Sequence, residues 1–212
     1  MGMDLRSVPV RLNSEPVRAM RRDAEVWETA SWQPPFHSDS DSDSDAGSGS
    51  DGIGEPLSET NQAMLADRPS ALDTLDGPWC SGARDYEQAE YALDPAAYRQ
   101  WDDYEERERS LPYRIIHGDR HFADHAVSGQ GMLWRCSARA FLIEAADTIE
   151  ALDETSIRRE FSIREMAPGV YKTRSDDDED ETFARAMNNL RWLARYYRDV
   201  AAHGYDLIVI SY

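Results

Sequence analysis

The feature that most constrains the fold is a short apolar run near the end of the chain, Leu207–Ile210. A strand with one exposed face alternates apolar and polar residues, whereas a strand covered on both faces is apolar throughout. The run therefore predicts a central strand that is covered on both faces. Because the longest purely apolar runs have four residues and a membrane-spanning helix needs about twenty, we do not expect a membrane protein.

Two amphipathic helices are predicted before this strand. Apolar residues recur at helical spacing from 138 to 152, with Ser137 as the expected cap, and again from 183 to 201. An acidic run, residues 176–181, stands directly before the second helix. Carboxylates at that position stabilise the positive end of the helix dipole, which gives the run a local structural role.

The N-terminal part predicts one strand and one helix. Residues 8–12 alternate between apolar side chains and Pro9 or Arg11, and the proline favours a sheet edge. A helix capped by Ser14 is expected to continue to Trp27, because apolar residues fall on one face over that range. A further helix is expected from Asp94-Pro95 to about Arg109, since this pair is typical of a helix start.

Together these patterns predict an α+β protein, a single compact domain in which a small mixed sheet packs against several helices. Residues 1–36 supply its N-terminal strand and helix, and residues 61–212 supply the remainder. Residues 37–60 are rich in Asp, Ser and Gly and contain no Lys or Arg. They hold too few apolar side chains to offset the entropy of ordering, so we expect a disordered acidic insertion.

The formal net charge of -18 is concentrated in two segments. Residues 37–60 hold seven acids and residues 176–181 hold six, which leaves 28 acids against 23 bases elsewhere. Such a chain disfavours nucleic acid and anionic membranes as partners, whereas a basic protein partner is compatible with it. Two cysteines and no apparent secretory signal fit a reducing compartment, and we expect a cytoplasmic protein.

The most suggestive cluster for chemistry places three histidines and two aspartates within nine residues: His117, Asp119, His121, Asp124 and His125. Zinc and iron favour imidazole and carboxylate ligands, so His117, His121 and His125 form a candidate metal site. His121 with Asp119 or Asp124 is a candidate acid/base pair. The catalytic Glu of zinc proteases is absent at this spacing, and solvated loop histidines explain the pattern as well.

Two other patterns carry weaker chemical signals. Cys136 follows Arg135, which could lower the pKa of the thiol and make it a nucleophile. The stretch 185–198 interleaves arginines with aromatics, a pattern that can stack on nucleic-acid bases. Pairing of these arginines with the surplus carboxylates, with the aromatics in the core, is the favoured interpretation. No nucleotide-binding motif occurs, and we expect no cofactor.

Several short motifs occur in a characteristic order: the Met1-Gly2-Met3 start, Ser14-Glu15, the turn with Trp79, the Gly118 loop, 138–141, 152–154, 161–163, 169–171 and 196–198 before the final strand. This order resembles the YfbM-like family of bacterial proteins, a domain-of-unknown-function family. The resemblance covers nearly the whole chain except residues 37–60, and Pro78 departs from the pattern. It implies a compact α+β domain and no activity, cofactor or catalytic residue.

The sequence therefore favours a non-catalytic, cytoplasmic protein-interaction or regulatory domain. One form of this hypothesis is that the domain neutralises a basic toxin. The alternative is a small enzyme, with or without a metal, that works through residues 117–125. In a third interpretation the domain is a scaffold and only its acidic insertion acts. The sequence leaves the oligomeric state open.

Overall fold

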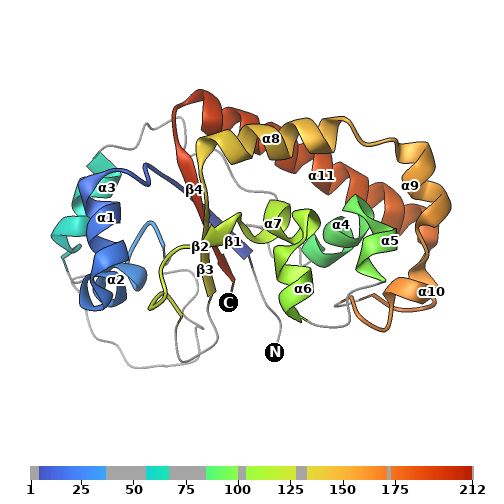
Figure 1. Cartoon of the computed structure of the whole chain (residues 1–212), viewed down its shortest axis with the longest axis horizontal. Coiled ribbons are helices and arrows are strands. Elements are labelled where there is room, and N and C mark those ends of the chain that lie inside the picture. Colours follow the sequence, from blue (N-terminus) through green and yellow to red (C-terminus); the bar gives the residue numbers. More distant parts are fainter. Residues whose placement is uncertain are drawn as a thin grey trace, which may run out of the picture.

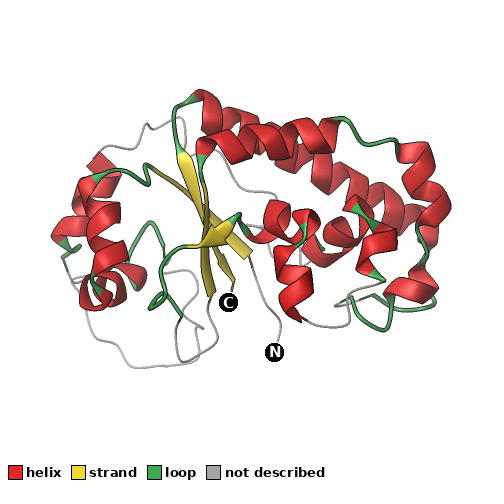
Figure 2. Cartoon of the chain, in the orientation of Figure 1, coloured by secondary structure: helices red, strands yellow, loops and turns green. Residues whose placement is uncertain are grey.

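An antiparallel sheet divides the molecule into two helical layers, which lie to its left and right in Figures 1 and 2. The computed structural model describes residues 5–36, 56–66, 85–99, 104–127, 133–170 and 173–211. These residues form a single compact α+β domain, as predicted. Within them, no helix is long and apolar enough to span a membrane.

The described sheet consists of β1 (Leu5–Val10), β2 (Arg120–His121), β3 (Leu133–Ser137) and β4 (Asp206–Ser211). Their order is β1-β4-β3-β2, and every pairing among them is antiparallel, so the predicted mixed sheet is wrong. The connection explains the difference. The helix that follows β3 leads away from the sheet, and the helix that precedes β4 leads back to the same end of it. Strand β4 therefore starts where β3 ends, with Leu207 opposite Ser137, and runs in the opposite direction.

Strand β4 is the central, doubly covered strand that its apolar run predicts. Leu207 and Val209 belong to one hydrophobic core, whereas Ile208 and Ile210 belong to the other. Each of these four side chains is at most 1% exposed. The placement of β1 at the sheet edge, which Pro9 predicts, is also confirmed.

The smaller core lies between the sheet and α1 (Glu15–Arg22), α2 (Ala24–Ser31) and α3 (Glu59–Ala66). The predicted single helix to Trp27 is therefore two helices. They are separated at Asp23, which has extended backbone angles and caps α2 by accepting hydrogen bonds from its first turn. The Asp23 side chain binds backbone N–H groups of the next turn, and this local cap ends α1 and begins α2 where the apolar pattern alone would continue one helix.

Helix α3 begins inside the segment that is predicted to be a disordered insertion. The buried Asn61 amide donates to the Ala30 and Pro34 carbonyls, at 3.0 and 2.8 Å, and ties α3 to the end of α2. The ordered part of the chain thus starts before residue 61, whereas residues 37–55 lie outside the described residues.

The larger core lies on the other face of the sheet. Its layer contains α4 (Tyr86–Leu93), α5 (Pro95–Tyr98), α6 (Tyr104–Arg109), α7 (Leu111–His117), α8 (Arg139–Glu150), α9 (Glu154–Glu160), α10 (Ile163–Met166) and α11 (Glu179–Ala202). Asp94 caps α5 as expected, but α5 ends at Tyr98 and a separate helix follows. Ser137 does not cap α8, because its hydroxyl accepts a hydrogen bond from the Asp119 N–H instead.

The Asp206 carboxylate fastens the start of β4 to both layers. One oxygen accepts a hydrogen bond from the Leu12 N–H at 2.9 Å, and the other accepts from the Arg139 N–H at 2.8 Å. The first bond holds the turn between β1 and α1, and the second satisfies an N–H in the first turn of α8. One side chain therefore sets where both helical layers join the central strand.

We expect Asp206→Ala to lower the free energy of unfolding by about 2 to 4 kcal/mol, because two hydrogen bonds to a charged acceptor are lost. Urea unfolding followed by circular dichroism measures the change. Asp176→Ala is the matched control, since Asp176 is exposed and has no polar contact among the described residues. Equal stability of the two variants would contradict the role given to Asp206.

Candidate functional site

The structure gives each of the three clustered histidines a different partner. His117 Nε2 lies 3.1 Å from a Glu90 carboxylate oxygen, and His121 Nε2 lies 3.2 Å from Glu108. His125 Nε2 lies 2.9 Å from the Met20 carbonyl oxygen. Among the described residues, no group of three or more His, Cys, Asp or Glu side chains is arranged to hold a metal ion.

The two aspartates of the cluster are not the acidic partners of His121. Asp119 accepts hydrogen bonds from the Arg114 guanidinium, the longer of which is 2.9 Å. Asp124 is exposed and has no polar contact with another described residue. The acid/base pair that the structure forms is therefore His121–Glu108, and Glu108 comes from α6 rather than from the residues around His121.

A buried charge cluster, consisting of Glu90, Arg107 and His117, joins α4, α6 and α7. The Arg107 Nε and Nη2 atoms donate to the two oxygens of Glu90, both at 2.8 Å. The Glu90 side chain is 0% exposed and that of His117 is 5% exposed. Glu87 adds a second carboxylate 3.6 Å from Arg107. Because Arg107 donates to both oxygens of Glu90, this bidentate pair fixes the distance between the two side chains and their relative orientation.

Hydrogen bonding determines the charge state of Glu90. Burial alone would raise the pKa of this carboxyl, but hydrogen bonds from Arg107 and His117 outweigh it and lower the pKa below its ordinary value. The carboxylate is thus ionised at neutral pH. His117 Nδ1 is buried and has no hydrogen-bond partner among the described residues, a costly arrangement for a polar atom.

Aromatic rings surround this cluster. The Tyr113 ring stacks on His117 with centroids 4.1 Å apart, and the Tyr86 ring meets His117 edge-on at 5.5 Å. The Arg107 guanidinium lies 5.2 Å from the Tyr98 ring. Burial raises the pKa of both Tyr98 and Tyr113, so neither phenol ionises near neutral pH. The rings exclude water and strengthen the ion pair they enclose.

A second ion pair continues from the buried cluster to the surface. Arg135 of β3, whose side chain is 4% exposed, pairs with Glu108 and lies 5.3 Å from the Tyr113 ring. Its Nε donates to the Gly118 carbonyl at 2.8 Å. Gly118 has φ +102°, and a Cβ there would lie 2.9 Å from the Arg135 Cβ, so only glycine suits this position. At the outer end, the His121 side chain is 52% exposed.

Cys136 does not have the environment of a nucleophile. Its side chain is fully buried, and burial raises the pKa of the thiol, which disfavours the reactive thiolate. The adjacent Arg135 points its guanidinium at Glu108 and Gly118. The prediction that Arg135 lowers the pKa of this thiol is therefore wrong. Cys80 and Trp79 lie outside the described residues.

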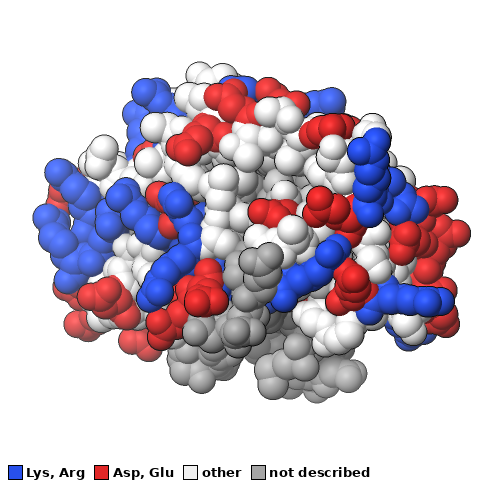
Figure 3. All heavy atoms as spheres, turned by 45° about the vertical axis from the view of Figure 1, so that its right-hand side comes forward, with Lys and Arg blue, Asp and Glu red and all other residues white. Residues whose placement is uncertain are grey.

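Three of the four arginines of α11 pair with carboxylates, as the favoured interpretation predicts, whereas Arg195 has no ion pair among the described residues. Their partners are Asp85 for Arg185, Glu154 for Arg191, and Asp147 with Glu150 for Arg198. Tyr196 and Tyr197 belong to the core, whereas Trp192 is 43% exposed. Basic and acidic side chains are accordingly interspersed over the face in Figure 3, which turns the right-hand side of Figure 1 toward the reader.

The acidic run 176–181, which spans the N-terminus of α11, serves the fold. Asp178 caps the helix by accepting from the Glu181 N–H at 2.9 Å. Glu179 and Asp180 both bind Arg158 of α9, and Glu179 also accepts from the Ile163 N–H at 3.1 Å. The local role that the sequence indicates for these carboxylates is confirmed. Several of them already bind cationic side chains or backbone N–H groups of the same domain.

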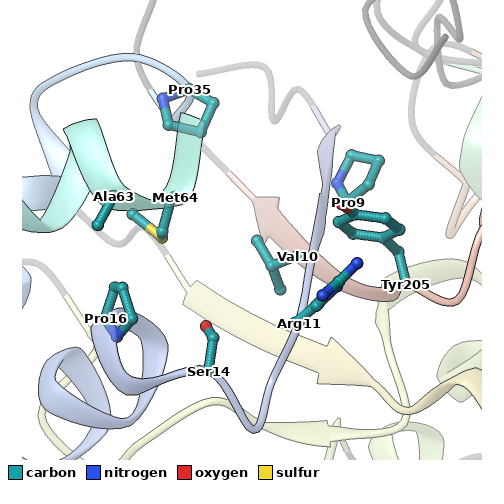
Figure 4. A pocket seen from close by; sticks show the side chains of 9 residues that line it. All are labelled: Pro9, Val10, Arg11, Ser14, Pro16, Pro35, Ala63, Met64 and Tyr205. Atoms are coloured by element: carbon teal, nitrogen blue, oxygen red, sulfur yellow. The ribbon is translucent and has the colours of Figure 1, made fainter. Parts of the chain in front are cut away.

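A cavity of about 230 Å³ opens beside the edge strand (Figure 4). Its walls are Pro9, Val10, Arg11, Ser14, Pro16, Pro35, Ala63, Met64 and Tyr205. In Figure 4 the Ser14 hydroxyl points into the space between Pro16 and Arg11, and it does not cap α1. The volume is below the roughly 300–1,000 Å³ of most small-molecule pockets, so the cavity suits a small ligand or one side chain.

Sequence reasoning missed Glu90, Arg107 and Glu108. Glu87 and Glu90 stand three residues apart and share a helix face with the buried Tyr86 and Ala89. Carboxylates on an apolar face are the only local signal for a buried charge. Their cationic partner stands 17 residues beyond Glu90 and is supplied by tertiary structure.

A comparison with solved structures finds YfbM from Escherichia coli, a protein of unknown function. The two chains share 18% identity over 60% of this chain and 76% of that chain, with a TM-score of 0.47. The likeness concerns the fold alone, and the neighbour carries the name of the family that the sequence motifs resemble. No protein-family model and no curated protein matches the chain.

We expect Glu90→Gln to lower the free energy of unfolding by about 3 to 5 kcal/mol, because it removes the hydrogen-bonded counterion of the buried Arg107 charge and leaves only Glu87, at 3.6 Å. Chemical unfolding at pH 7 measures the loss. Glu28→Gln removes an exposed carboxylate that has no ion pair among the described residues and is the control. A loss below 1 kcal/mol in Glu90→Gln would contradict the assigned role.

The lowered pKa of Glu90 also predicts how stability depends on pH. The unfolded carboxyl titrates near 4.5, and the folded one titrates below that. The contribution of the ion pair is therefore complete above pH 4.5 and is lost as the pH falls through the lower, folded-state value. Between pH 7 and pH 3 the free energy of unfolding should fall less steeply with decreasing pH in Glu90→Gln than in Glu28→Gln.

In a Cys80→Ser variant, where Cys136 is the only thiol, we expect the native protein to resist a disulfide-exchange reagent such as DTNB. Burial blocks access to the sulfur, and the raised pKa keeps it protonated. Absorbance should report one thiol per chain after unfolding in urea. Rapid reaction of the native protein would restore Cys136 as a candidate nucleophile.

Proposed function

We propose that this chain is a non-catalytic protein-interaction domain. The observation that carries the proposal is that side chains suited to acid/base chemistry are held in separate structural contacts. His117 belongs to the buried charge cluster, His125 binds the Met20 carbonyl, and Asp119 binds Arg114. Groups that are engaged in this way stabilise the fold and do not converge on a shared point where a substrate atom would react.

The partner we propose is a basic protein, bound mainly through the acidic segment 37–60. That segment carries seven acids without a Lys or Arg, whereas Asp178, Glu179 and Asp180 at the start of α11 are engaged within the fold. Opposite charge accelerates encounter and selects partners. If the role is regulatory, the domain would cover the cationic surface of a partner, such as a toxin, in the cytoplasm. Nucleic acid and anionic membranes would be repelled.

We expect the full chain to capture a basic protein from an extract of its own host at low salt and to lose it at high salt, because exposed charges are screened. In the test variant, the six acids from Asp39 to Glu55 are replaced by Asn or Gln, which leaves Glu59 of α3 intact. This variant should lose the partner, as identified by mass spectrometry.

A matched control keeps the charge and changes the other abundant residue. Replacing the six serines between Ser38 and Ser50 with Ala should leave capture unchanged. Absence of any partner at low salt, or capture that persists after the acids are neutralised, would contradict the proposal.

A second candidate function is acid/base catalysis at His121. The specific observation in its favour is that His121 remains half exposed and is paired with Glu108, which also forms an ion pair with the buried Arg135. Such a pair orients an imidazole toward solvent. If a host that lacks the gene is rescued by the wild-type chain but not by His121→Ala, while His203→Ala rescues it, the enzyme hypothesis is favoured.

A further inference from the structure

The cavity beside the edge strand has a lining of one charge sign. Among the nine described residues that line it, Arg11 is the only charged one, and none is a carboxylate. Ser14 and Tyr205 are also polar. The other walls are apolar: Pro9, Val10, Pro16, Pro35, Ala63 and Met64. Such a lining selects a ligand that combines a negative charge with an apolar body.

The turn between β1 and α1 holds the arginine and the serine at the same cavity. The Ser14 N–H donates to the Arg11 carbonyl at 2.9 Å, and the Leu12 N–H between them donates to Asp206. The Ser14 hydroxyl does not cap α1 and points into the cavity in Figure 4. A guanidinium and a hydroxyl on one turn can donate to the same anion.

Tyr205 orients the Arg11 guanidinium. The Arg11 Cζ atom lies 5.0 Å from the centre of the Tyr205 ring, and Tyr205 is itself buried. A guanidinium that lies over a ring keeps its N–H groups in its own plane, where two of them match the two oxygens of a carboxylate. Arg11 has a further interaction within the chain. A guanidinium has more N–H donors than one contact uses, so donors remain for a ligand.

The backbone at this edge disfavours an added peptide strand. The N–H and the C=O of Trp134 both bond toward the β2 side of the sheet. Backbone groups of successive residues point to alternate sides of a strand. Through the registers of β3 with β4 and of β4 with β1, Val8 therefore bonds to β4, and Pro9 faces the free edge. Because proline has no N–H, a strand laid along the cavity would lack one ladder hydrogen bond there.

We propose that this cavity binds a small monocarboxylic acid with a short branched or aromatic tail. The carboxylate accepts hydrogen bonds from Arg11 and Ser14, and the tail contacts Val10 and Met64. A volume of about 230 Å³ limits the size of the tail. One arginine matches one negative charge, whereas the formal net charge of -18 repels a polyanion more strongly.

Titration followed by two-dimensional NMR of the backbone amides tests the proposal, with benzoate and 3-methylbutanoate as probes and benzamide as the uncharged control. We expect saturable shifts of the Val10, Ser14 and Met64 amides. Benzamide should bind at least about tenfold more weakly than benzoate, because it lacks the charge. Arg11→Gln should weaken benzoate binding by a similar factor and leave benzamide binding unchanged. Ala63→Phe, which fills the cavity, should abolish both.

Arg164→Gln is the matched control, because Arg164 is exposed and has no polar side-chain contact among the described residues. It should leave the affinity for benzoate unchanged. Absence of saturable binding, equal affinities for benzoate and benzamide in the wild-type chain, or equal losses in Arg11→Gln and Arg164→Gln would overturn the proposal. A peptide ending in valine that binds more tightly than 3-methylbutanoate would also overturn it, because the occupant would then be a chain terminus.

The site is independent of the proposed function, since it takes a small anion and lies outside the acidic segment 37–60. Neutralising the six acids from Asp39 to Glu55 should abolish capture of a basic protein and leave benzoate binding intact. Loss of benzoate binding in that variant would contradict the assignment of the site to the cavity residues.

Discussion

The fold depends on burying both faces of one short strand. Strand β4 sends Leu207 and Val209 into one core and Ile208 and Ile210 into the other. Neither helical layer can therefore be removed without exposing half of this strand to water, where each large apolar side chain costs about 1.5–3 kcal/mol. Asp206 fixes the start of the strand to the β1–α1 turn and to α8. The two layers are thus coupled through a few residues at the end of the chain.

The second organising principle is internal neutralisation of charge. Arg107 is matched by Glu90, Arg135 by Glu108, and three arginines of α11 by carboxylates of neighbouring helices. Buried pairs of this kind contribute more to specifying one arrangement than to net stability, but removing one member is costly. Against this background the acidic segment 37–60, which has no Lys or Arg, is the exception, and we assign binding to it.

Much of the fold could be predicted from periodicity, but the site could not. The apolar run of β4, Pro9 at the sheet edge and the stripe of α11 are local patterns, and each predicted its element. The break at Asp23 was missed because a cap and a continuing helix face look alike in sequence. Glu90 and Arg107 meet only through tertiary packing. Likewise, the closely spaced histidines 117, 121 and 125 suggested one site, whereas the chain turns at Gly118 and sends them to separate partners.

Native mass spectrometry of the chain, purified gently and without chelator from its own host, tests most directly whether the domain acts by binding. If the acid/base residues serve the fold, the spectrum should show the chain in a complex with another protein and without stoichiometric metal. One metal ion per chain that is lost in His121→Ala and His125→Ala would contradict the account. It would return residues 117–125 to the centre of an enzymatic mechanism.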